Sequence, residues 1–467
     1  MTTGVSYYFG DKAFYRKVLA VAVPIMIQNG ISNFVNLLDN IMVGSIGTEE
    51  MSAVAIVNKL MFVFILCLFG GCAGIGIFTA QFYGKGDGEG VRNTFRLKIL
   101  NNLCLLLIGL TVFSLFGEKL ISLYLHEGSD TGDLAKTFTL AREYLSVVMI
   151  GMIPQALAES YAGTLRETEH TTLPMIAGMS AVFTNLFLNY VLIFGHFGAP
   201  ALGVKGAAIA TVIAKFTELA ILVAAAHTRH DKFPFFRGVY RSFRLSGAFV
   251  PRVLAKSLPL LVNEMMWSTG VAALAFCYSL KGLAVVAGYN ISSTVSDIFN
   301  VATLALGNAI AIIVGNLLGA NRMKEAKQTD ARLIVFTLLI SIALCVILFF
   351  LAPVFPLLFS GTDALSRAYA SSFLRIYAFY LIVNAVASAC YFTLRSGGKT
   401  IITFLFDSVY MIGVCFPFTY VLARFTPVSV ELLYALSLGI EIIKVFVGLA
   451  IVGSGRWMQN IVGSENG

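Results

Sequence analysis

The chain of 467 residues is 58% hydrophobic and 12% charged, and its mean hydropathy is +0.83. A water-soluble globular protein does not sustain such values over this length, so that class is excluded. Apolar runs recur along the chain between short polar breaks, and many reach the roughly 20 residues that a helix needs to cross a bilayer. The sequence therefore predicts an all-α integral membrane protein.

Twelve transmembrane helices are expected, arranged as two pseudo-symmetric lobes of six. The N-terminal lobe should cover residues 1–227 and the C-terminal lobe residues 252–467, with a basic and aromatic cytoplasmic linker at 228–251. This linker is either solvated or lies on the anionic inner leaflet. The expected spans are 16–43, 51–82, 93–117, 137–165, 172–195, 201–226, 253–280, 285–318, 331–359, 366–394, 400–423 and 430–453.

The net charge of +8 reflects membrane topology and not a nucleic-acid partner. Basic residues gather before the first span and after each even-numbered span; Lys85, Arg92, Arg96 and Lys98, for example, follow span two. The opposite loops hold few basic residues. The positive-inside rule then places both termini in the cytoplasm of a multi-pass protein of the cytoplasmic membrane.

The two halves of the sequence repeat each other. Short motifs of the first half recur in the second at one constant offset, and motifs further along recur at a slightly smaller one. Six spans per repeat is an even number, so both halves enter the membrane in the same orientation, related by an axis along the membrane normal. A cleft between the lobes is the expected substrate site. The matched pairs are Pro24 with Pro259, Gly84 with Gly319, Thr164 with Thr393, and Lys215 with Lys444.

Asp39 is the first candidate functional residue. It belongs to an apolar stretch, residues 23–44, that also carries Asn33 and Asn36. An ionisable group inside a membrane helix is costly, so Asp39 is expected to face a protein interior or a water-filled cavity, where it can exchange protons or ions. The alternative is a carboxylate at a helix end on the membrane surface, since Gly44 follows closely.

Further acidic residues lie within the expected spans. Glu264 has no local partner and sits beside Asn263, five residues after Pro259, so these polar groups could line one point of the cleft. Asp297 and Asp407 are also unpaired in sequence, and both a functional and a structural role remain open.

Two pairs of opposite charge are spaced for structural ion pairing. Lys215 with Glu218, and Glu441 with Lys444, are three residues apart on their helices. No nucleotide-binding motif, nucleophile elbow or HExxH motif occurs, and neither the histidines nor the cysteines have metal-ligand spacing. The sequence therefore predicts no enzyme and no cofactor, and transport is expected to use an ion gradient.

Three segments carry a family resemblance: LLDNIMVGSIG in the first span, QFYGKGD after the second, and FLNYVLIFGHFGAPALGVKGAAIAT at residues 187–211. They resemble the multidrug and toxic compound extrusion family, and the likeness covers essentially the whole chain. It implies an inner-membrane antiporter that exports organic, often cationic, compounds in exchange for protons or sodium ions.

The resemblance also implies site residues. Asp39, Asn185 and Thr211 match the family's first-lobe residues, whereas Asn189 stands where many proton-coupled members have an aspartate. In the second lobe Glu264 matches a glutamate used for cation coupling in another branch. The aspartate that accompanies that glutamate is replaced here by Asn384.

Protons are favoured over sodium as the coupling ion. A hard cation prefers several oxygen ligands with carboxylates among them, and each lobe offers one carboxylate plus amides. The alternative is a sodium ion at Glu264 and Asn384. A flippase for lipid-linked saccharides is the alternative function, although it would be expected to show extra spans and cavity arginines. We expect a monomer with small organic substrates, the lipid bilayer as its surroundings and no nucleic-acid partner.

Overall fold

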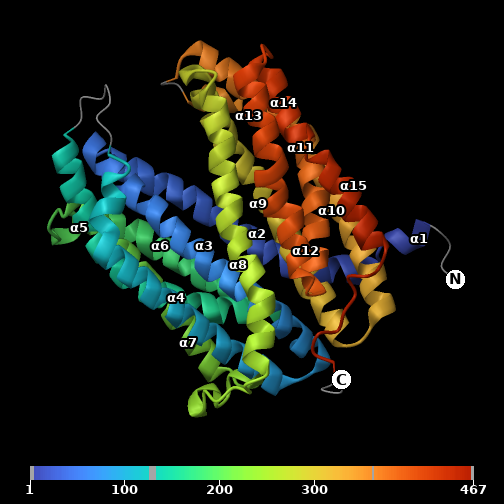
Figure 1. Cartoon of the computed structure of the whole chain (residues 1–467). Coiled ribbons are helices and arrows are strands. Elements are labelled where there is room, and N and C mark those ends of the chain that lie inside the picture. The colour runs from blue at the N-terminus through green and yellow to red at the C-terminus, as the bar shows by residue number, and fades with distance from the viewer. Residues whose placement is uncertain (1–4, 126–132, 360–361, 464–467) are drawn as a thin grey trace. The chain divides into compact units, whose positions relative to one another are not determined.

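The computed structural model describes residues 5–125, 133–359 and 362–463. Within these ranges the chain folds into helices without a strand (Figure 1). Twelve helical segments are long and apolar enough to cross a membrane. The predicted fold class, an all-α protein with twelve spans, is confirmed.

The first six spans are single long helices, preceded by the short α1 (Val5–Tyr8). Three short 3₁₀ helices lie in the connections: η1 (His196–Gly198), η2 (Pro234–Phe236) and η3 (Val239–Arg241). The spans are α2 (Lys12–Gly44), α3 (Thr48–Lys85), α4 (Gly88–Ser122), α5 (Leu134–Glu167), α6 (Thr172–Phe194) and α7 (Gly203–Thr228).

The last six spans include two that are interrupted. The eleventh passes through two consecutive π-helical turns, η5 and η6, and the twelfth breaks at Ile440 and Glu441. The elements are α8 (Phe249–Ser279), α9 (Leu283–Gly319), α10 (Met323–Leu351), η4 (Phe355–Leu358), α11 (Ala364–Ser396), α12 (Thr400–Phe404), η5 (Leu405–Val409), η6 (Met411–Cys415), α13 (Phe416–Phe425), α14 (Val430–Gly439) and α15 (Ile442–Gly453).

Eleven of the expected spans agree with the observed helices to within a few residues, but the ninth is displaced. Its expected range is 331–359, whereas the helix runs from Met323 to Leu351. Pro353 and Pro356 end the helix early, because proline lacks the N–H that a continuing helix needs. The polar start KEAKQTDAR consists largely of good helix formers and extends the helix beyond its apolar part.

Two compact units make up the chain. One contains residues 1–26, 80–87 and 255–467, and the other contains residues 27–79 and 88–254. Each unit has a core of Leu, Ile, Val, Phe and Ala side chains. The units differ from the expected lobes in two segments, the start of α2 and the tip of α3, and the expected lobe boundaries stay a prediction.

The glycines matched by the repeat cross each other in the first of these units. A Cβ on Gly84 would lie 1.8 Å from the Asn316 carbonyl oxygen, and one on Gly319 would lie 1.9 Å from the Gln81 carbonyl oxygen. Gln81 and Asn316 are themselves paired by the repeat, at the same offset as the two glycines. The crossing is therefore the same contact made twice, and it requires glycine on both helices because the backbones touch.

The segment expected as a linker is partly folded against its own unit. Phe236 is fully buried, and Phe95 and Tyr161 pack on its ring. Arg96 donates from Nε to the Val239 carbonyl over 2.8 Å. The prediction of a fully solvated linker is therefore wrong for residues 233–239. Burying these aromatic side chains removes apolar surface from water, which stabilises the fold.

Arg96 and Lys98 have a role that the sequence prediction did not include. Both were expected at the start of the third span, as markers of topology, and both are buried on α4, with Lys98 fully inaccessible. Lys98 forms an ion pair with Glu167 and donates to the Thr164 hydroxyl over 3.2 Å. A buried lysine must be paired, so a sequence view that counts it only as a topology marker misses its structural role.

Candidate functional site

Asp39 lies on α2, and its carboxylate reaches α6. The Asn189 side-chain amide donates to Asp39 Oδ1 over 2.8 Å. Asp39 is half-buried, five residues before the end of its helix. Among the ion pairs of the described residues, none includes Asp39. A carboxylate that is held by an amide and has no paired cation can bind either a proton or another cation.

Asn185 and Thr211 extend this cluster. Asn185 is one helical turn before Asn189 on α6, and the two amides are 3.2 Å apart. The Thr211 hydroxyl on α7 lies 3.3 Å from the Asn185 side-chain amide and donates to the Ala207 carbonyl. The structure thus brings together Asp39, Asn185, Asn189 and Thr211 from three helices. Tyr144 of α5, which the sequence did not indicate, is buried beside Thr211.

The Asn185 amide can serve either protonation state of Asp39. In the orientation that satisfies both ends of this amide, its nitrogen donates to Asp39 Oδ2 over 2.8 Å and its oxygen faces Thr211. An ionised carboxylate needs the donating nitrogen, and a protonated one can donate its O–H to the amide oxygen. Because an amide carries both a donor and an acceptor, Asn185 has a group that can hydrogen-bond to Asp39 in either charge state.

Asn33 and Asn36 lie on the same helix as Asp39, but both are exposed. Neither forms a side-chain hydrogen bond within the described part of α2 and its neighbours. The cluster around Asp39 does not include them. Their role stays a prediction.

A second polar cluster lies at the π-helical turns of the eleventh span. Asp407 Oδ2 accepts a hydrogen bond from the Asn263 amide over 3.1 Å. Ser408 donates to the Asn263 carbonyl and side-chain oxygens, each at 2.7 Å. The structure thus joins two of the predicted residues, Asn263 and Asp407. π-Helical turns are frequently found at functional sites.

Lys444 connects Asp407 to Glu441. Its ammonium is 3.3 Å from Asp407 Oδ1 and 3.4 Å from Glu441 Oε2. The expected Lys444–Glu441 pair is therefore present but is one half of a triad, with two carboxylates to one ammonium. The Lys215–Glu218 pair is also observed, at 3.2 Å.

Glu264 and Asn384 belong to different networks. The charges that act on Glu264 are those of Arg395 and Asp407, whereas the Asn384 amide donates to the Asn300 side chain over 3.1 Å. Asp297 lies exposed on α9. Within the described residues, no group of three or more His, Cys, Asp or Glu side chains is arranged to hold a metal ion.

Asp330 is a buried carboxylate that sequence reasoning missed. It is 2% exposed on α10, and the Thr393 hydroxyl donates to it over 2.5 Å. Thr393 corresponds by the repeat to Thr164, which binds the buried Lys98. Both halves of the sequence contain the motif TLR, and its repeated threonine was the sequence signal that could have pointed to this site. The polar sequence around Asp330 made the residue look like part of a loop.

The family match follows the repeat. The MatE family model matches residues 24–191 and again 259–422, and the two segments begin at the paired prolines Pro24 and Pro259. A probable multidrug resistance protein NorM of Thermotoga maritima is 24% identical over 407 residues, 84% of this chain and 82% of that protein. Another probable NorM, of Agrobacterium fabrum, is 25% identical over 80% of this chain and 79% of its own length.

Solved structures share the fold. A crystal structure of a variant of the Vibrio cholerae MATE transporter VcmN has a TM-score of 0.86 at 18% identity, covering 96% of this chain and 98% of that one. The two family matches together span more than half of the sequence. The chain therefore belongs to the MatE family, the multidrug and toxic compound extrusion transporters, and is a multi-pass membrane transporter and not an enzyme.

Proposed function

We propose that this transporter is a secondary active antiporter that exports small organic cations in exchange for protons. In this proposal it acts by alternating access in the cytoplasmic membrane, with both termini in the cytoplasm. Relatives named as multidrug resistance proteins support the substrate class. The observation that carries the coupling is the single carboxylate of Asp39 among amides that can serve both of its charge states.

The geometry suggests how exchange is enforced. An ionised Asp39 attracts a cationic substrate, while a protonated Asp39 is neutral and offers it no charge. Proton and organic cation therefore compete for the same carboxylate, and only one can be held at a time. Such mutually exclusive binding is what antiport requires, because each ligand displaces the other across the cycle.

Sodium coupling is the second candidate, and one observation favours it. The Asn189 side-chain oxygen is buried and accepts no hydrogen bond from the described residues. Together with Asp39, Asn185 and Thr211 it could supply oxygen ligands to a monovalent cation. We rank sodium coupling second because these four residues supply only one carboxylate, and hard cations prefer more than one carboxylate ligand.

The test is export of ethidium from proteoliposomes under separately imposed proton and sodium gradients. A proton gradient alone should drive export, and Asp39→Asn should abolish it. Asn40→Ala is the matched control, since Asn40 is the exposed neighbour on the same helix. Export by Asp39→Asn at the wild-type rate would reject the role of Asp39. Export driven by sodium, with the proton gradient collapsed by an uncoupler, would establish the second candidate.

Glu264 is proposed as the second coupling residue, in the C-terminal half. The charged residues that act on Glu264, Arg395 and Asp407, carry opposite charges. Ionisation of Glu264 therefore changes the net charge of this group of residues. Glu264→Gln keeps the size and hydrogen-bonding capacity of the protonated acid. It should slow or uncouple export without loss of folded protein. Wild-type coupling in this variant would remove Glu264 from the mechanism.

A further inference from the structure

The connection between α7 and α8 carries a cationic face. Residues 229–252 hold six Lys or Arg residues against one acid, Asp231. All six side chains are exposed, and within the described part of the chain none of them takes part in an ion pair. Like charges at this density repel one another unless an anionic surface or solvent compensates them. The cationic face consists of Arg229, Lys232, Arg237, Arg241, Arg244 and Arg252.

Buried side chains hold this connection against its own unit. Phe236 and Val239 are buried, whereas Arg237 and Arg241, which alternate with them along the chain, are exposed. Arg96 of α4 fixes the backbone at the same place, since its Nε donates to the Val239 carbonyl over 2.8 Å. The apolar anchors therefore determine which side of the connection turns outward, and the arginines lie on that side.

Tyr240 marks the depth of the connection relative to the spans. Its ring stacks on that of His227, with the centroids 5.6 Å apart, and His227 is the last residue but one of α7. The Tyr240 hydroxyl is hydrogen-bonded to that of Tyr161, which lies six residues, or about 9 Å of helix rise, before the end of α5. Tyr240 thus lies at the level where the fourth and sixth spans end, which corresponds to the headgroup region of a bilayer.

The exposed aromatic side chains favour a lipid surface over a soluble polyanion. Tyr240 is 51% exposed and Phe243 is 39% exposed, and both are adjacent in sequence to arginines of the cationic face. Aromatic rings beside basic residues are typical of the membrane–water interface, where the rings meet the headgroup level and the cations meet anionic lipid. A soluble acidic partner would use the charges but not the depth of the rings.

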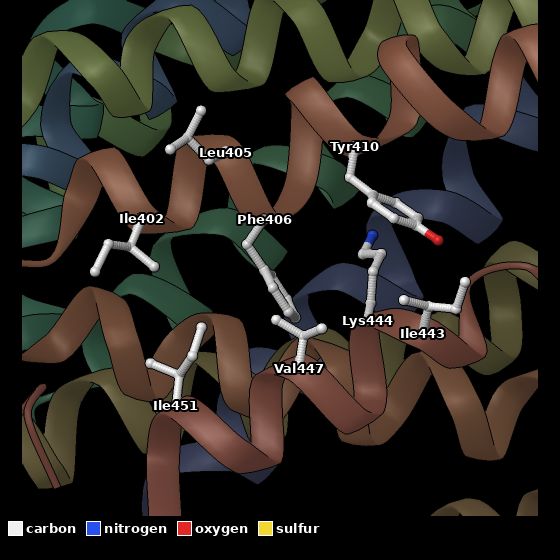
Figure 2. Close-up of a pocket in the computed structure, with 8 residues that line it drawn as sticks. All are labelled: Ile402, Leu405, Phe406, Tyr410, Ile443, Lys444, Val447 and Ile451. Carbon is white, nitrogen blue, oxygen red and sulfur yellow. The ribbon is translucent and has the colours of Figure 1, made fainter. Parts of the chain in front are cut away.

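A membrane-facing cavity elsewhere in the chain suits an anionic headgroup less well. It has a volume of about 230 Å³ and opens between α12 and η5 on one side and α15 on the other. Figure 2 shows Lys444 in its lining, together with apolar side chains and Tyr410. The Lys444 ammonium is already paired with Asp407, at 3.3 Å, and with Glu441, at 3.4 Å. Two carboxylates compensate this charge, unlike the charges of the cationic face.

We propose that the cationic face of residues 229–252 is a docking surface for the headgroups of anionic phospholipids of the inner leaflet. The arginines bind the phosphate groups, and Tyr240 and Phe243 lie among the headgroups. The buried anchors at Phe236 and Val239 present these groups as a preformed surface. This inference does not depend on the coupling ion or on export.

The test measures lipid enrichment around full-length protein in nanodiscs, which expose both membrane faces. A bimane fluorophore is attached at Ser246→Cys, an exposed position of the connection, and protein without this substitution supplies the blank for the native cysteines. The quencher is phosphatidylglycerol with a nitroxide near its headgroup, compared with phosphatidylcholine that carries the same nitroxide. Phosphatidylglycerol should quench more strongly at equal mole fraction, and the difference should shrink as salt rises.

Variants of the cationic face test the charge. Arg241→Gln should raise the fraction of phosphatidylglycerol needed for half-maximal quenching about fivefold, equivalent to about 1 kcal/mol. The triple variant Arg237→Gln, Arg241→Gln, Arg244→Gln should lose the preference. The same three positions changed to lysine keep the charge and should keep the preference, as should Lys205→Gln at the opposite end of α7.

Three results would overturn the proposal. The first is equal quenching by the two lipids in the parent protein. The second is an unchanged preference in the triple glutamine variant. The third is a fluorescence change with soluble polyglutamate in phosphatidylcholine nanodiscs but none with phosphatidylglycerol, which would show an acidic protein partner instead.

Discussion

Gly319→Ala should destabilise the protein, although alanine is the better helix former. The new Cβ would lie 1.9 Å from the Gln81 carbonyl oxygen, where an ordinary contact is at least 3.4 Å. The α3 tip and α9 must therefore separate by more than about 1 Å. The tip has little freedom to move, because Gln81 is fully buried and its side chain bonds the carbonyls of Ser396 and Gln459 and the Ile461 amide.

Two opposing free-energy contributions decide whether Gly319→Ala stabilises or destabilises the protein. Replacing glycine by alanine inside a helix gains about 0.5 to 1 kcal/mol. Overpacking costs about 1 to 3 kcal/mol, and each Gln81 hydrogen bond that breaks costs about 1 kcal/mol more. The loss exceeds the gain, so the free energy of unfolding should fall by roughly 1 to 4 kcal/mol.

Thermal unfolding midpoints of purified protein in detergent measure this effect. Gly84→Ala should behave like Gly319→Ala, because its Cβ would meet the Asn316 carbonyl oxygen at 1.8 Å. Gly30→Ala is the control, since no atom lies within 4 Å of its Cβ position. It should match or exceed the wild-type midpoint. If Gly319→Ala and Gly30→Ala shift the midpoint equally, the crossing does not require glycine and the reasoning is refuted.

Two further predictions concern buried titratable groups. Asp330→Asn should keep or raise the thermal midpoint, because the amide can retain the Thr393 hydrogen bond and removes a charge from the interior; a drop of several degrees would show that the carboxylate itself is required. His170 lies between α5 and α6 against Phe233, and burial lowers its pKa. The unfolded chain then binds the proton more readily, so stability should fall as pH drops from about 7 to 5. His170→Gln should flatten that pH dependence of the midpoint, and an unchanged slope would contradict the assignment.

The sequence by itself determined the membrane class, the number of spans and the internal repeat. The length of an apolar run is set by the thickness of the bilayer that the helix must cross. Most expected spans therefore agreed with the observed helices to within a few residues. The constant offset that pairs Pro24 with Pro259 also pairs Gly84 with Gly319, and the two family matches begin at those prolines. Asp39 was also visible from the sequence, because a carboxylate inside an apolar run is rare whatever its partners are.

Tertiary structure decided which polar residues meet. Asp407 and Lys444 lie on different spans, and only packing brings their charged groups to within 3.3 Å of each other. Lys98 lies at the polar start of the expected third span and Asp330 just before the expected ninth, yet both are buried beside repeat-related threonines. Local composition reports the average environment of a segment. The burial of one side chain depends instead on which helices pack against it, and that information lies in contacts distant in sequence.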